Sequence, residues 1–89
     1  MTLDAYIDVV EANTGNVLDT ATVSVDMDYV EDNAESVEEW IENGDEWNEI
    51  SENWRRAGKL VAFNVTNMED IIEDLKFDEF QDKTQYASV

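Results

Sequence analysis

Two β-rich runs open the sequence, LDAYIDVVE at residues 3–11 and VLDTATVSVD at residues 17–26, separated by NTGN at residues 13–16. In the first run, alternate residues form one apolar face: Leu3, Ala5, Ile7 and Val9. The matching face of the second run is predicted to hold Val17, Ala21, Val23 and Val25. Such alternation is typical of strands, and Gly15 can adopt a positive φ in the turn. The two runs therefore predict a β-hairpin.

The next part of the chain predicts two helices separated by Gly44. Asp32 fits an N-cap followed three residues later by Glu35, and Gly44 suits the end of that helix. Asp45 is predicted to cap a second helix, which ends at Gly58. The apolar stripe of the first helix is predicted at Ala34, Val37, Trp40 and Ile41, and that of the second at Trp47, Ile50, Trp54 and Ala57.

Trp40, Trp47 and Trp54 are spaced seven residues apart, which is also the period of a coiled coil. The companion positions are Val37, Gly44 and Ser51, a poor set for such a seam. We therefore expect aromatic residues of the core, with a dimer seam or a partner contact as the alternatives. Both a monomer and a homodimer stay open.

A third strand is predicted at residues 59–66, with Val61, Phe63 and Val65 on one face. Thr66 and Glu69 match a capping box at the start of a last helix that ends near Lys76. The stripe of this helix is Met68, Ile71, Ile72 and Leu75. The order β-β-α-α-β-α predicts an α+β fold, a small three-stranded, mainly antiparallel sheet with helices on one face.

We expect one acidic domain over residues 1–80, with Phe80 folding back onto the core and a frayed tail at residues 81–89. No apolar run has the ~18 residues of a membrane span, and no basic-then-apolar signal opens the chain. A cytoplasmic protein is therefore expected.

The net charge is −18, from 23 acidic and five basic residues. Direct binding of nucleic acid or of an anionic membrane is not expected, because both need many Lys and Arg side chains. The chain has no cysteine and no histidine, so it lacks disulfides, thiolate nucleophiles and the commonest general base. The expected partners are cations or basic proteins.

Most of this charge is concentrated between residues 26 and 52, where no Lys, Arg or His occurs. Apolar residues occur at intervals along this stretch. It therefore predicts an acidic face over a folded core and not a disordered tail. Its acidic residues are our candidate partner-binding surface: Asp26, Asp28, Glu31, Asp32, Glu35, Glu38, Glu39, Glu42, Asp45, Glu46, Glu49 and Glu52. A second group could extend it: Glu69, Asp70, Glu73 and Asp74.

Catalysis and calcium binding are the first alternatives for so many carboxylates. An enzyme without His or Cys would depend on a carboxylate pair, and a domain this small offers little room for a substrate cleft. The residues from Asp26 to Asp32 begin like a calcium loop but lack the glycine that an EF-hand needs. We expect no enzyme, no metal site and no cofactor.

The charge density suggests another use. Duplex DNA carries one charge per ~1.7 Å of axis, so a charge of −18 corresponds to ~30 Å of duplex. A compact domain of 89 residues is also of order 30 Å across. Crowded like charges destabilise a fold, and a net charge of about 2–8 is enough for solubility. We therefore expect the charge to have a function beyond solubility. The main alternative is that the chain is an acidic domain adapted to high salt, which would screen the repulsion.

In size, charge and mixed architecture the chain resembles the acidic DNA-mimic inhibitors of phages and mobile elements, among them antirestriction and anti-CRISPR proteins. Residues 6–18, followed by an acidic helix, are also loosely similar to a unit of ArdA-type antirestriction proteins. The resemblance implies a protein that inhibits a basic DNA-binding host protein such as a restriction enzyme, CRISPR complex or nuclease. The alternative is an acidic phage protein that binds a host factor such as RNA polymerase without imitating DNA.

Overall fold

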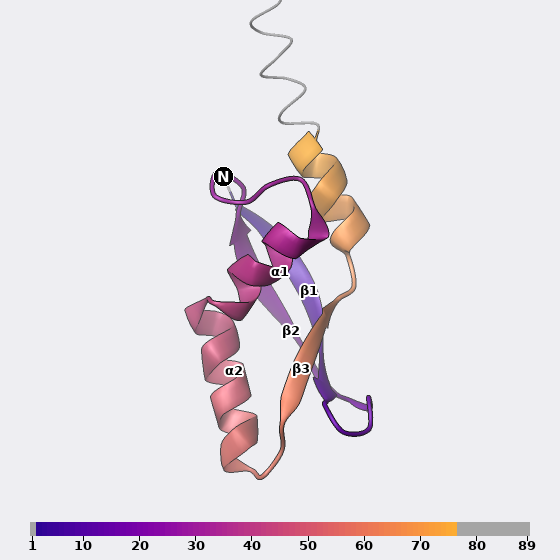
Figure 1. Ribbon diagram of the computed structural model, residues 1–89, viewed down its shortest axis with the longest axis vertical. Coiled ribbons are helices and arrows are strands. Elements are labelled where there is room, and N and C mark those ends of the chain that lie inside the picture. The colour runs from indigo at the N-terminus through magenta and orange to yellow at the C-terminus, as the bar shows by residue number, and fades with distance from the viewer. Residues whose placement is uncertain (1, 77–89) are drawn as a thin grey trace, which may run out of the picture.

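A computed structural model describes residues 2–76, which form a three-stranded antiparallel sheet with helices on one face (Figure 1). β1 (Thr2–Glu11) pairs with β2 (Val17–Asp26) on one side and with β3 (Val61–Val65) on the other, so the strand order is β2-β1-β3. The helices are α1 (Ala34–Glu42), α2 (Asp45–Arg56) and a last one over residues 68–76. The predicted order β-β-α-α-β-α and the α+β class are confirmed.

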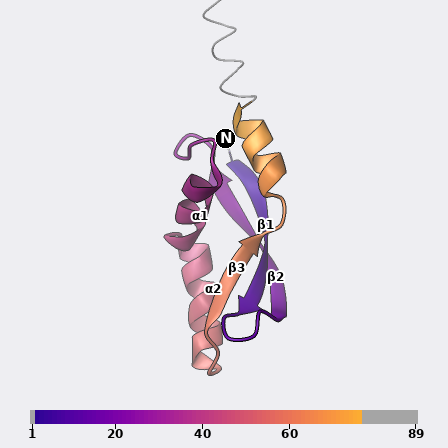
Figure 2. The same cartoon turned by 45° about the vertical axis from the view of Figure 1, so that its right-hand side comes forward.

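The core lies between the inner face of the sheet and the helices. Ala5, Ile7 and Val9 alternate along β1 and are fully or almost fully buried, as predicted. They pack in one cluster with apolar residues of β2 and of all three helices: Val23, Val25, Val37, Ile41, Trp47, Ile71 and Leu75. Figure 2 shows α1 and α2 following one another along the same side of the sheet.

The prediction for Val17 was wrong. The register changes where Val9 faces Asp19 but Val10 faces Val17, so Leu18 is an extra residue in β2, a β-bulge. Paired residues share a face of the sheet, and one extra residue reverses the alternation beyond it. Val17 therefore lies with Val10 on the outer face, and it is 57% exposed.

The helix starts differ by one residue from the predictions. Asn33, not Asp32, is the N-cap of α1, and its Oδ1 accepts the backbone N–H of Ser36 at 2.8 Å. Gly44 is the N-cap of α2, and Asp45 is already helical. At both positions the acidic residue still lies beside the helix N-terminus, where negative charge is favourable.

All three tryptophans pack against the core, as expected. Trp47 is buried and meets the ring of Phe63 edge-on, with the ring centroids 4.9 Å apart. The stripes that the tryptophans define are nevertheless shorter than predicted. Ala34 and Ala57 are exposed, because one lies in the first turn of α1 and the other just beyond the end of α2.

β3 is shorter than the predicted run at residues 59–66, and side chains extend its pairing. Asn67 Oδ1 accepts the N–H of Tyr6, and Asn67 Nδ2 donates to the carbonyl of Asp4, both at 2.9 Å. The hydroxyl of Thr66 donates to the carbonyl of Tyr6 at 3.1 Å, and among the described residues the predicted capping-box bond from the N–H of Glu69 to this hydroxyl is absent. The predicted packing of Phe80, the domain end at residue 80 and the tail lie outside the described residues.

Candidate protein-binding surface

The structure places the predicted acidic residues on a continuous part of the chain that runs from the end of β2 through α1 and α2. Val37 and Ile41 are fully buried, and they fix the rotation of α1 so that its four carboxylates are exposed: Glu35, Glu38, Glu39 and Glu42. Those of the preceding loop and the start of α2 are exposed as well: Asp28, Glu31, Asp32, Asp45, Glu46 and Glu49. Asp26 and Glu52 are partly buried. We call these twelve residues the acidic surface.

The spacing of charge along α1 is close to that of one DNA strand. Nine residues of α helix span roughly 13.5 Å. Four carboxylates over that length give about one charge per 3.4 Å, which is also the spacing per strand in duplex DNA. Residues three or four apart on a helix are neighbours, so these carboxylates form a row on a rigid support.

Most of the acidic surface is not neutralised by the residues that the structure describes. Within residues 2–76, the following carboxylates have neither a hydrogen bond nor an ion pair: Asp32, Glu35, Glu38, Glu39, Glu42, Asp45 and Glu49. Neighbouring like charges on a helix each destabilise it by ~0.2–0.5 kcal/mol. The surface therefore carries charge that would be relieved by a cationic partner.

Three other members of the acidic surface accept hydrogen bonds from neutral donors, which add no positive charge beside them. Glu46 Oε2 accepts the backbone N–H of Ser24 at 3.2 Å. Asp26 Oδ1 accepts the backbone N–H of Asp28 at 3.0 Å, and Glu31 Oε2 accepts from the Asn33 amide at 3.3 Å. These bonds orient carboxylates at the edge of the acidic surface.

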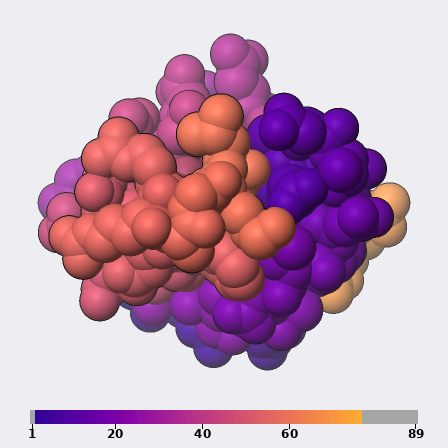
Figure 3. Space-filling view, turned by 90° about the horizontal axis from the view of Figure 1, so that it is seen from below, coloured from indigo at the N-terminus to yellow at the C-terminus, as the bar shows by residue number. Residues whose placement is uncertain are grey.

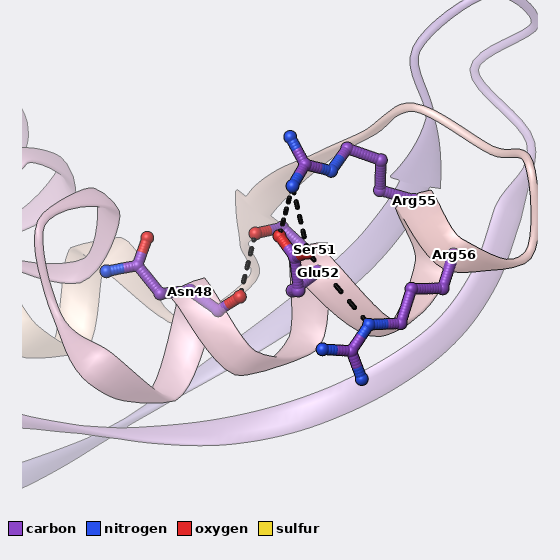
Figure 4. A network of polar contacts seen from close by, with 5 residues as sticks. All are labelled: Asn48, Ser51, Glu52, Arg55 and Arg56. Carbon is purple, nitrogen blue, oxygen red and sulfur yellow. Dashed lines mark hydrogen bonds and ion pairs between the residues drawn. The ribbon is translucent and has the colours of Figure 1, made fainter.

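Glu52 is the exception, because arginines of its own helix neutralise it (Figure 4). Arg55 Nη2 lies 2.7 and 2.8 Å from its two carboxylate oxygens, and Arg56 Nε lies 4.0 Å from one of them. The hydrogen bond and the charge of Arg55 lower the pKa of Glu52. We therefore separate Glu52 from the unpaired part of the acidic surface.

Arg55, Arg56 and Lys59 are gathered at the end of α2, away from α1 (Figure 1). Lys59 Nζ reaches across to Glu11 Oε2 at 2.9 Å, and this hydrogen bond, with a second from Thr14, lowers the pKa of Glu11. Figure 3 shows this end of the molecule, where the loop after α2 lies beside the turn of the β1–β2 hairpin. These three cations therefore neutralise carboxylates at this end, and none of them pairs with a glutamate of α1.

An aromatic pair borders the acidic surface, and sequence reasoning did not single out one of its members. Tyr29 is 76% exposed, and its ring stacks on that of Trp40 with centroids 6.0 Å apart and an interplanar angle of 12°. Tyr29 lies in the loop between Asp28 and Glu31. The sequence did contain a signal for this contact: Tyr29 is an aromatic residue that belongs to no apolar stripe and is flanked by carboxylates.

Glu69, Asp70, Glu73 and Asp74 are all exposed on the last helix. They form a second acidic row, on a different element from α1 and α2 (Figure 1). Among the described residues, no three carboxylates are grouped closely enough to hold a metal ion. The negative charge is thus spread along helices and does not converge on a point.

In residues 2–76, no helix has the length and apolar character needed to cross a membrane. Comparisons of the chain with protein families, with curated proteins and with solved structures find no match.

Proposed function

We propose that this protein is a DNA mimic of the kind carried by phages and mobile elements. It binds the DNA-binding surface of a host defence or DNA-processing protein, such as a restriction enzyme, CRISPR complex or nuclease, and thereby inhibits it in the host cytoplasm. It acts by occupying that surface and not by catalysis.

The observation that supports this proposal most strongly is the row of four exposed carboxylates on α1, at about one charge per 3.4 Å of helix, none of which is paired with another residue between 2 and 76. A DNA-binding groove offers Lys and Arg side chains at positions that match phosphates. Opposite charge would also speed the encounter of the two proteins. Asp45 and Glu49 continue the row onto α2.

The distribution of the basic residues is a second support. Arg55, Arg56 and Lys59 lie at the far end of α2, where two of them hold Glu52 and Glu11. A Lys or Arg placed three or four residues from a glutamate of α1 would relieve the repulsion along that helix. Within residues 2–76, no Lys or Arg pairs with the glutamates of α1, so the described part of the chain does not relieve that repulsion.

The experiment is an affinity pull-down from bacterial lysate, eluted with a salt gradient and repeated with excess duplex DNA. The proposal predicts recovery of a DNA-binding protein that duplex DNA displaces. A variant in which Glu35, Glu38 and Glu42 are all changed to Lys should recover none of it. A matched triple change to Lys at Glu69, Glu73 and Asp74, in the second acidic row on the last helix, should reduce recovery much less, because that row only extends the acidic surface. Equal recovery by both variants would contradict the assignment to α1.

The stacked pair of exposed Tyr29 and partly buried Trp40 favours one alternative, an acidic phage protein that contacts a host factor such as RNA polymerase through a mixed surface. Duplex DNA would not displace that partner. A halophilic domain would instead recover no partner and would unfold in dilute buffer.

A further inference from the structure

A hollow of about 200 Å³ lies where α1 meets α2 beside the edge of β2. It is lined by Val23, Ser24, Trp40, Gly44, Asp45 and Glu46. The valine and the indole give it apolar walls, and the two acidic residues give it a negative rim. Gly44 lies in its lining at the junction of the two helices, where a Cβ would stand 3.2 Å from the carbonyl oxygen of Trp40.

Two contacts fix the position of the indole in this wall. The Nε1–H of Trp40 donates to the carbonyl of Ser24 at 3.0 Å. The ring also stacks on that of Tyr29. A ligand that packs against Trp40 would therefore meet a side chain that is already ordered, so little conformational freedom would be lost on binding.

The carboxylates of the rim have free acceptor capacity. Glu46 Oε2 accepts the N–H of Ser24, which orients the carboxylate and leaves Oε1 without a donor among the described residues. Asp45 has no partner in the described part of the chain. The C-terminus of α1 and the N-terminus of α2 also meet here, and their partial charges have opposite sign and offset one another. The electrostatic potential in the hollow is therefore determined by the two carboxylates and is negative.

We propose that this hollow binds one arginine side chain of the protein partner. The guanidinium is planar, is weakly hydrated for a cation, stacks on aromatic rings and hydrogen-bonds carboxylates through several N–H groups. A lysine ammonium is a compact and strongly hydrated charge, so it gains less from an aromatic wall. This inference rests on the proposed function. It adds a preference for arginine over lysine in the partner to a contact that is otherwise made by many separate charges.

The test is a titration of the full-length ¹⁵N-labelled protein with hexa-arginine and, separately, with hexa-lysine. The indole N–H signal of Trp40 is assigned from its loss in Trp40→Phe. We expect hexa-arginine to bind about two- to fivefold more tightly than hexa-lysine, the range that one cation–π contact supplies. We also expect it to shift the indole signal of Trp40 and the amide signal of Gly44.

The double variant Asp45→Asn/Glu46→Gln should lose this preference for arginine. The matched control Glu38→Gln/Glu42→Gln removes the same charge from α1, so it should weaken both peptides alike and keep the preference. Chemical-shift dispersion reports whether each variant is folded. Equal binding of the two peptides to the unmodified protein, or a preference that survives in Asp45→Asn/Glu46→Gln, would overturn the inference alone. If neither peptide bound, the proposed function would fail with it.

Discussion

The indole N–H of Trp40 donates to the backbone carbonyl of Ser24 at 3.0 Å, and this bond joins α1 to the outer edge of β2. The N–H of the same residue, Ser24, donates to Glu46 of α2. Both backbone groups of one edge position are thus satisfied by helical side chains. An unpaired strand edge is a site of aggregation, so the two contacts also protect this edge while they position the acidic helices.

The Trp40 bond can be tested by Trp40→Phe, which keeps an aromatic ring but removes the donor. We expect the free energy of unfolding in urea to fall by about 1 kcal/mol beyond the packing loss. Trp54→Phe is the matched control, because Trp54 also packs against the core and no hydrogen bond of its indole is present among the described residues. Equal losses in the two variants would show that the bond to Ser24 contributes nothing.

Gly58 ends α2 with a φ of +86°, and no atom lies within 4 Å of the position that a Cβ would take. Gly58→Ala should therefore destabilise the fold through the backbone alone, by roughly 1 kcal/mol. Gly58→Asn should lose less, because asparagine tolerates the left-handed region better. Urea unfolding measures both, and an alanine variant as stable as the parent would contradict this account of the turn.

Glu38 has like charges three residues before it and four residues after it, at Glu35 and Glu42. Glu38→Gln should raise the free energy of unfolding by ~0.2–0.5 kcal/mol per relieved pair at low salt. The gain should disappear near 1 M NaCl, where the screening length is about 3 Å. The same variant should bind the captured partner more weakly. A variant that is no more stable in dilute buffer would show that α1 is not under electrostatic strain.

The ion pair of Lys59 with Glu11 predicts a pH dependence. Because the pKa of Glu11 is lowered in the fold, the pair contributes stability above the pKa of the unfolded chain, and that contribution is lost as the pH falls through the folded pKa. Lys59→Gln should therefore be less stable than the parent at pH 7 but equally stable at pH 2. An NMR titration of the Glu11 carboxyl should show its pKa rising toward the ordinary value in this variant.

The sequence was sufficient for the elements and for most of the core. The alternation of Ala5, Ile7 and Val9 defines β1, and the positions of Val37 and Ile41 one helical turn apart define the buried side of α1. These patterns are local, so they are visible without the partners that the side chains contact. The same patterns placed the glutamates of α1 on the exposed side.

The features that were missed depend on residues far apart in the chain. The bulge at Leu18 is a property of the pairing of two strands, so alternation within β2 alone placed Val17 on the wrong face. Asn67 extends the sheet by bonding Tyr6 and Asp4, more than sixty residues away in the chain. The pairing of Glu52 with Arg55 is local, and the spacing of three residues could have predicted it.

The proposed function is tested most directly by competition on the captured partner. A fluorescently labelled duplex of about thirty base pairs is bound to the partner, the acidic protein is added, and anisotropy follows the duplex. DNA mimicry predicts complete displacement with one acidic protein, or one dimer of it, per DNA site. It also predicts that the Lys triple variant at Glu35, Glu38 and Glu42 displaces nothing. A stable complex that holds the duplex and the acidic protein together, with the anisotropy unchanged, would contradict the account.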